Sequence, residues 1–231
     1  MSCDLPLAQA YLAAARWKDL EAHCGAWAQR DTSASAKLAN YYRAQALARL
    51  GRFDDADKVA AQALAAAPGD DLYSGLEVDL LLARGRNDDA IQRLVAITKR
   101  PGSRPGTKNN LAWLQASLGK DLTSAAANAH EAIRDSKDAA GIHNTLAAVL
   151  IELDDLHAGL QACLKSMELG VRDAPAPEDW YVVGRLYEKL GFRDDAIAAY
   201  KRLPPDKRDG FFPSSYRLAR TRLEKLGIKS P

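Results

Sequence analysis

The sequence is poor in the residues that usually mark redox, metal or membrane proteins. Its 231 residues include only three cysteines, Cys3, Cys24 and Cys163, which are widely spaced and form no Cys-x2-Cys pair. This spacing indicates neither a zinc motif nor a disulfide framework. The four histidines show no metal-ligand spacing either. We therefore expect no metal and no cofactor. No apolar run approaches the roughly 18 residues of a membrane span, so we expect no membrane insertion.

Catalytic motifs are absent as well. The chain has no Gly-x4-Gly-Lys-Ser/Thr phosphate loop, no Gly-x-Ser-x-Gly elbow and no Gly-x-Gly-x2-Gly turn. We therefore name no catalytic residue and expect that the protein is not an enzyme. Charge of one sign is also lacking, because 32 Lys and Arg face 30 Asp and Glu. A net charge of +2 argues against nucleic acid as a main partner.

What the sequence does contain is helical periodicity, which is clearest between residues 177 and 210. Trp180, Val183 and Tyr187 recur at spacings of three and four, the pattern of one buried helix face. Gly191 then provides the residue without a Cβ that favours a helix end. Acidic residues at 194 and 195 open a second helix, where they complement the positive end of its dipole. The segment is predicted to be a helical hairpin.

This hairpin resembles the tetratricopeptide repeat (TPR), whose pattern is Trp-x2-Leu-Gly-x2-Tyr followed by Ala-x3-Phe. The matching run here is Trp180-x2-Val183-Gly184-x2-Tyr187-x8-Ala196-x3-Tyr200. The small residues Gly184 and Ala196 are expected where the two helices come closest. The turn residue recurs at intervals of 34 to 37 residues, close to the family period. Its equivalents are Ala15, Gly51, Gly85, Gly119 and Asp154.

The resemblance implies an all-α, right-handed superhelical solenoid that runs as one array over residues 1–231. It has about six TPR hairpins, followed by a capping helix at 214–226 with a polar outer face. The expected hairpins are 1–34, 37–70, 71–104, 105–139, 140–174 and 177–210. The string Asn-Asn-Leu-Ala-Trp at 109–113 is similar to a helix start common in bacterial TPR proteins.

Paired aspartates at 54–55, 88–89 and 194–195 are open to two interpretations. Adjacent carboxylates occur in acid–base and metal sites. All three pairs, however, lie at the start of a second helix, where an acidic residue caps the helix and complements its dipole. A feature that recurs at one place in the repeat favours the architectural interpretation.

The resemblance also implies where a partner would bind. In TPR proteins the first helix of each hairpin lines a concave groove that holds a peptide or a partner protein. Asparagine bonds a peptide backbone through both ends of its amide, and aromatic residues dominate binding hot spots. The alternative for the aromatic residues is packing against a neighbouring hairpin. The expected partner-binding residues are Tyr41, Tyr42, Gln45, Asp79, Asn109, Asn110, Trp113, Asn144, Tyr181 and Arg185.

We therefore predict a non-enzymatic scaffold for protein–protein interaction. The alternative is an accessory TPR domain of a larger bacterial enzyme or cell-envelope assembly protein. The first residues carry no leader signal, so we expect a cytoplasmic location; a piece of a longer, exported protein fits the sequence equally. The basic residues after Tyr200 indicate either a solvated face or a site for an acidic partner or membrane surface. Nothing in the sequence indicates an oligomeric state.

Overall fold

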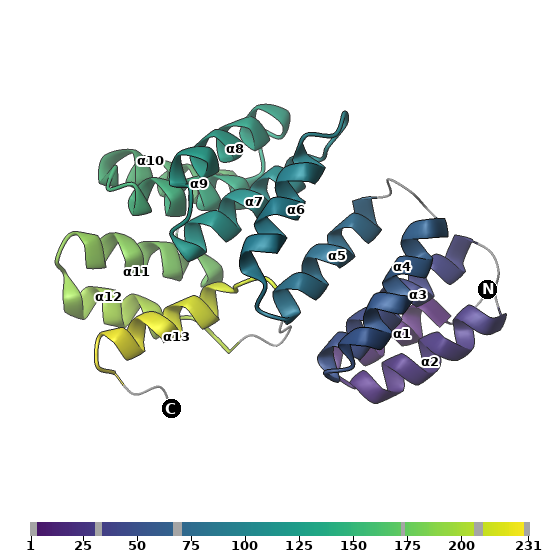
Figure 1. The fold of residues 1–231 in the computed structure, drawn as a ribbon. Helices are drawn as coiled ribbons and strands as arrows, with labels where there is room; N and C mark the ends of the chain where they lie inside the picture. The colour runs from purple at the N-terminus through teal and green to yellow at the C-terminus, as the bar shows by residue number, and fades with distance from the viewer. Residues whose placement is uncertain (1–3, 31–33, 67–70, 172–173, 206–209, 229–231) are drawn as a thin grey trace. The chain divides into compact units, whose positions relative to one another are not determined.

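The computed structural model describes residues 4–30, 34–66, 71–171, 174–205 and 210–228, which form thirteen α-helices, one 3-10 helix and no strand (Figure 1). The prediction of an all-α helical-repeat fold is confirmed. The helices are α1 (Asp4–Ala13), α2 (Trp17–Arg30), α3 (Ala34–Arg49), α4 (Phe53–Ala66), α5 (Asp71–Ala83), α6 (Asn87–Thr98), α7 (Pro105–Leu118), α8 (Leu122–Asp135), α9 (Ala140–Glu152), α10 (Leu156–Leu169), η1 (Pro177–Asp179), α11 (Trp180–Lys189), α12 (Arg193–Tyr200) and α13 (Ser215–Lys225).

The helices group into two compact units, Met1–Arg93 and Leu94–Pro231, with the division inside α6. In unit 1, α1, α3 and α5 are first helices of successive hairpins, and each contacts the next. In unit 2 the same relation links α7, α9 and α11, and α11 also contacts α13. Because first helices pack on first helices, residues about one repeat apart in sequence come to face each other. The expected ends of the first two hairpins, near 34 and 70, adjoin residues 31–33 and 67–70, which lie outside the described ranges.

A single type of turn joins the two helices of every hairpin. The six residues that mark the repeat period all adopt a left-handed conformation, with φ between 52° and 83°. At each of them the N–H bonds back three residues at 3.0–3.1 Å, and the next N–H bonds back five residues at 2.9–3.0 Å. This is the Schellman ending of a helix. Four of the six are glycine, whereas Ala15 and Asp154 adopt the same conformation with a side chain.

Two of the aspartates that follow these turns bond an arginine of the turn. Asp55 accepts from Arg52 Nε at 2.9 Å, and Asp89 accepts from Arg86 Nε at 2.7 Å. The bond to Arg52 also lowers the pKa of Asp55. Each arginine directly follows the left-handed residue, so the pair links the turn to the first turn of the second helix. These two carboxylates therefore have a structural role.

Alanine dominates the core of both units, which allows helix axes to approach closely. In unit 2, Ala112, Ala125, Ala129 and Ala147 are fully buried in one cluster. In unit 1, the cluster around Ala8, Leu20 and Trp27 includes Cys24. Burial raises the pKa of the Cys24 thiol to about 12, so this sulfur is a packing group and not a nucleophile. Cys163 is also a buried free thiol, and Cys3 lies outside the described residues.

Among the described glycines, Gly184 lies closest to a side chain of the facing helix in its hairpin. A Cβ placed on Gly184 would lie 2.4 Å from Cε1 of Tyr200, a residue buried at the end of α12. The Tyr200 ring cannot easily move aside, because its hydroxyl donates to Glu188 at 2.7 Å. The sequence predicted a small residue here, and the aromatic ring is the physical reason.

We predict that Gly184→Ala lowers the free energy of unfolding by roughly 1–3 kcal/mol, because the added methyl overpacks the contact with Tyr200. The control is Gly141→Ala in α9, where a Cβ would meet nothing within 4 Å; that variant should be neutral or slightly stabilised. Urea unfolding of both variants measures the difference. Equal midpoints for the two would show that the Gly184 contact is not tight in solution.

Candidate interaction site

The first helices of unit 1 bring four of the predicted residues to one area. Gln45 on α3 donates from Nε2 to Oδ2 of Asp79 on α5, at 3.3 Å. Tyr41 and Tyr42 lie in the same helix as Gln45, with ring centroids 5.4 Å apart in an edge-to-face pair. All four side chains are half-buried. The area therefore offers two phenol rings, an amide and a carboxylate that remain partly accessible.

The carboxylate in this area is poorly compensated. Burial raises the pKa of Asp79 to about 6, although the hydrogen bond from Gln45 and the charge of Arg49 oppose that shift. Burial also raises the pKa of Tyr41 to about 12, and the Asp79 charge adds to the effect. Near neutral pH the area thus holds an ionised carboxylate, with the Gln45 amide bonded to it and the charge of Arg49 acting on it. A positively charged group of a partner would be attracted to it.

A cavity of about 510 Å³ also opens in unit 1, beside α4, α5 and the start of α6. Its charged residues already form pairs: Arg84 bonds Asp57 at 2.6 Å, and Arg93 is paired with Glu77. Alanine and leucine side chains form the rest of its wall. The third arginine of the wall, Arg86, bonds Asp89 outside it. Because every charged side chain in the wall already has a partner of opposite charge, the cavity is better explained by packing than as a ligand site.

In unit 2 the predicted asparagines lie on α7 and α9. Asn110 is exposed, Asn109 is half-buried, and Asn144 is buried with 8% of its surface exposed. The side-chain oxygens of Asn109 and Asn144 are both buried, and neither has a hydrogen-bond partner among the described residues. Buried acceptors in native proteins are nearly always paired. These two oxygens are therefore candidates for donors supplied by another molecule.

The two predicted aromatic residues of unit 2 are packed within the unit. The rings of Trp113 and Tyr181 meet edge to face with centroids 6.0 Å apart. Trp113 Nε1 donates to the carbonyl oxygen of Pro213 at 2.7 Å. Tyr181 is 7% exposed, and burial raises its pKa to about 12. Both side chains thus belong to first helices and contact each other, and Trp113 is also bonded by the C-terminal part of the same chain.

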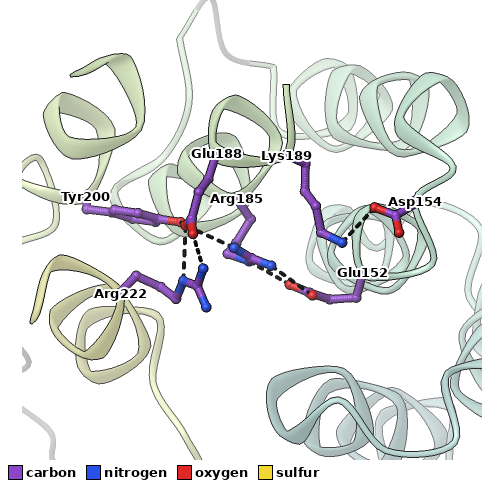
Figure 2. A network of polar contacts seen from close by, with 7 residues as sticks. All are labelled: Glu152, Asp154, Arg185, Glu188, Lys189, Tyr200 and Arg222. Carbon is purple, nitrogen blue, oxygen red and sulfur yellow. Dashed lines mark hydrogen bonds and ion pairs between the residues drawn. The ribbon is translucent and has the colours of Figure 1, made fainter. Parts of the chain in front are cut away.

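Arg185 lies at the centre of a polar network that joins four helices (Figure 2). Its guanidinium donates to both carboxylate oxygens of Glu152, at 2.6 and 2.9 Å, and pairs with Glu188 at 2.9 Å. Glu188 also accepts from Arg222 on α13 at 3.0 Å. Burial alone would lower the pKa of Arg185, but the bonds to Glu152 raise it. Burial and the Arg185 charge lower the pKa of Arg222.

The network residues Glu152, Glu188 and Arg222 were not predicted from the sequence, although a signal for them exists. Glu152 and Arg185 are 33 residues apart, and Glu188 and Arg222 are 34 apart. Gln45 and Asp79 are also 34 apart. Each separation is close to one repeat period, so complementary polar residues one period apart on first helices indicate contact. Pro213 has no such signal, because its bond to Trp113 spans 100 residues.

Several solved structures have a similar helical fold. PilW, described as a widely conserved type IV pilus biogenesis factor, matches with a TM-score of 0.64 and 16% identity, over 95% of this chain and 96% of PilW. A tetratricopeptide repeat protein from Parabacteroides merdae matches with a TM-score of 0.66 and 11% identity, over 97% of this chain and 91% of that one. The fold is that of the TPR proteins. A thermophilic TPR protein in Thermus thermophilus matches with a TM-score of 0.59 and 19% identity, over 83% of this chain and 98% of that one.

No protein-family model matches the sequence, and no curated protein matches it. In the described part of the chain, no three histidine, cysteine or acidic side chains are grouped so that they would hold a metal ion. No helix within the described ranges combines the length and the apolar composition needed to cross a bilayer.

The raised pKa of Asp79 leads to a pH-dependent prediction. A folded-state pKa of about 6 exceeds the unfolded value of about 3.9, so the folded state binds the proton more tightly. Ionisation of Asp79 therefore lowers stability as pH rises from about 4 to about 6. We expect Asp79→Asn to raise the free energy of unfolding at pH 7 by about 1–2 kcal/mol, and the gain to vanish near pH 4.

Urea unfolding at both pH values measures this effect. The exposed Asp54 provides the contrast, because its charge lies in the first turn of α4 and favours the helix dipole. Asp54→Asn should leave stability at pH 7 unchanged or slightly lower. If Asp79→Asn also lowers stability at pH 7, the Asp79 carboxylate is compensated better than the structure indicates.

Proposed function

We propose that this chain is a non-enzymatic scaffold that holds a segment of a partner protein on the faces formed by its first helices. One contact area lies on unit 1 and the other on unit 2. The unit 1 area consists of Tyr41, Tyr42, Gln45 and Asp79. The unit 2 area consists of Asn109, Asn110, Trp113, Asn144, Tyr181 and Arg185. Within it, Asn109 and Asn144 provide the acceptors for hydrogen bonds from the partner.

The observation that carries this proposal is the pair of unpaired amide oxygens on α7 and α9. Asn109 Oδ1 and Asn144 Oδ1 are both buried, and no described residue donates to either of them. An acceptor left in this state costs roughly 1–3 kcal/mol, a cost that a partner can remove by donating a backbone N–H. The two residues are about one repeat period apart, on first helices that contact each other. Successive N–H groups of one partner segment would suit such an arrangement.

The unit 1 area supports the same function with different chemistry. Asp79 presents a carboxylate with a raised pKa, beside the ring pair of Tyr41 and Tyr42. A lysine or arginine of the partner would pair with the carboxylate, and it would also be attracted to the face of a tyrosine ring. Gln45 adds an amide that holds Asp79 in place. We therefore infer that the partner segment presents a basic side chain to unit 1.

The second candidate is an accessory TPR domain that serves a larger bacterial enzyme or an envelope assembly protein. The observation in its favour is the likeness to PilW over nearly the full length of both chains, since PilW is described as a pilus biogenesis factor. The two candidates differ in location. A chain found in the cytoplasmic fraction of cells favours the independent scaffold, and one found with the envelope favours the assembly role.

We predict that Asn144→Leu, a change that preserves shape, leaves the free energy of unfolding unchanged or raises it by about 1 kcal/mol, because it removes a buried acceptor without a donor. The same change should weaken partner binding by about 0.5–1.5 kcal/mol for the lost hydrogen bond. The partner is first captured with the wild-type chain, and binding and urea unfolding are then measured for both proteins.

The matched control is Asn128→Leu on the second helix α8, whose side chain is half-buried and bonds Ser124. This variant should bind as the wild type does. A variant Asn144→Leu that loses stability and retains full affinity would assign Asn144 to the core, and the groove proposal for unit 2 would then be wrong.

A further inference from the structure

The segment Gly210–Leu226 makes an unusual set of contacts with unit 2. Its first part reaches α7, where the Pro213 carbonyl accepts from Trp113 at 2.7 Å. Its helix, α13, drawn in yellow in Figure 1, contacts η1, α11 and α12. Arg193 also donates to the carbonyl oxygen of Leu226 at 2.6 Å. The segment therefore reaches α7 at Pro213 and packs on α11, α12 and η1 through α13.

These contacts involve the side chains that the repeat pattern assigns to a partner. Trp113 is bonded to the segment directly. Tyr181 contacts the Trp113 ring. Arg185 is connected to the segment through Glu188, which also bonds Arg222 (Figure 2). The segment thus makes, from within the chain, the contacts expected of a bound partner: a backbone carbonyl on an indole N–H and an arginine on a carboxylate.

The attachment of the helix in this segment is shallow. In α13 only Ala219 and Leu223 are buried, whereas Arg217, Arg220 and Lys225 are exposed. By comparison, α11 buries five residues, including Tyr181 and Arg185. Tyr216, Leu218 and Leu226 are only partly buried where they pack against the unit 2 core, and the Arg222 side chain is still 26% exposed. A helix that fully buries only two side chains is a candidate for local opening.

Charge determines what else fits this face. Arg185 faces both Glu152 and Glu188, and Arg222 provides the second positive charge. If α13 leaves, two carboxylates remain with one guanidinium. A replacement must therefore bring a positive charge to Glu188, and arginine is the residue that pairs with a carboxylate through two N–H groups.

We propose that Gly210–Leu226 is an exchangeable ligand within the chain, and that the partner of unit 2 is a basic segment of another protein that presents an arginine to Glu188 and displaces Gly210–Leu226. The inference rests on the proposed function, because it concerns the same face of unit 2. The inference adds the class of partner. It also explains why Gly210–Leu226 contacts Trp113 and Glu188 in the absence of that partner.

The test uses a fluorescein-labelled peptide of residues 210–228 and the full chain. In the wild type the tethered segment competes with the peptide at an effective concentration in the millimolar range. Arg222→Glu places a third carboxylate beside Glu152 and Glu188, which should release α13 and open the face. We expect the peptide to bind this variant at least about tenfold more tightly than the wild type, as measured by fluorescence anisotropy.

The control is Lys225→Glu, the same change of charge at an exposed site on α13, which should bind the peptide as weakly as the wild type. Circular dichroism checks that both variants remain helical. Equal peptide affinity for a helical Arg222→Glu and the wild type would overturn the proposal. If that variant binds the peptide but Asn144→Leu shows no loss of partner affinity, the exchange stands and the asparagine contact fails.

A second measurement does not depend on any variant. Hydrogen exchange of the wild-type chain should show amides of α13 exchanging at least about 100-fold faster than those of α9 and α11, because the segment opens locally. Equal protection of α13 and α11 would show that the helix is a permanent part of the core. The proposal would then be wrong even if Arg222→Glu failed to fold.

Discussion

The structure depends on a backbone reversal in which one residue adopts a left-handed conformation. This reversal ends the first helix of all six hairpins with the same two hydrogen bonds. For Ala15 and Asp154 the conformation costs roughly 1–2 kcal/mol, because each carries a Cβ. The rest of each unit must offset this cost. Because the reversal recurs at a nearly constant interval, it also sets which residues of successive first helices meet.

The two units use the same architecture for different surface chemistry. The first-helix area of unit 1 keeps a half-buried carboxylate beside half-buried phenol rings, and the Gln45 amide donates to this carboxylate. In unit 2 the corresponding helices carry two arginines and two glutamates that neutralise one another. The unit 1 area is suited to attract a positively charged group. In unit 2, Arg222 of the same chain already pairs with Glu188.

The sequence was sufficient to predict the helical hairpins, because their pattern depends on local spacing and on small residues at the closest approach. It also placed the candidate residues on first helices. It did not reveal which of them are accessible. The environment of Trp113 depends on a segment 100 residues further along the chain, a contact that no repeat pattern encodes. The contact of Arg185 could have been predicted from the sequence, because its partner Glu152 lies about one repeat period away.

The bond between Trp113 and Pro213 has a consequence for how unit 2 forms. Most contacts in a helical-repeat fold join neighbours along the chain, so such proteins have low contact order and fold by propagation between adjacent repeats. A bond that spans 100 residues requires closure of a long loop, and the entropy of closure disfavours it until the intervening hairpins have formed. Whichever end folds first, α7 to α12 therefore assemble before the bond between Trp113 and Pro213 forms. Every newly folded molecule passes through a stage in which Trp113 has no carbonyl to bond.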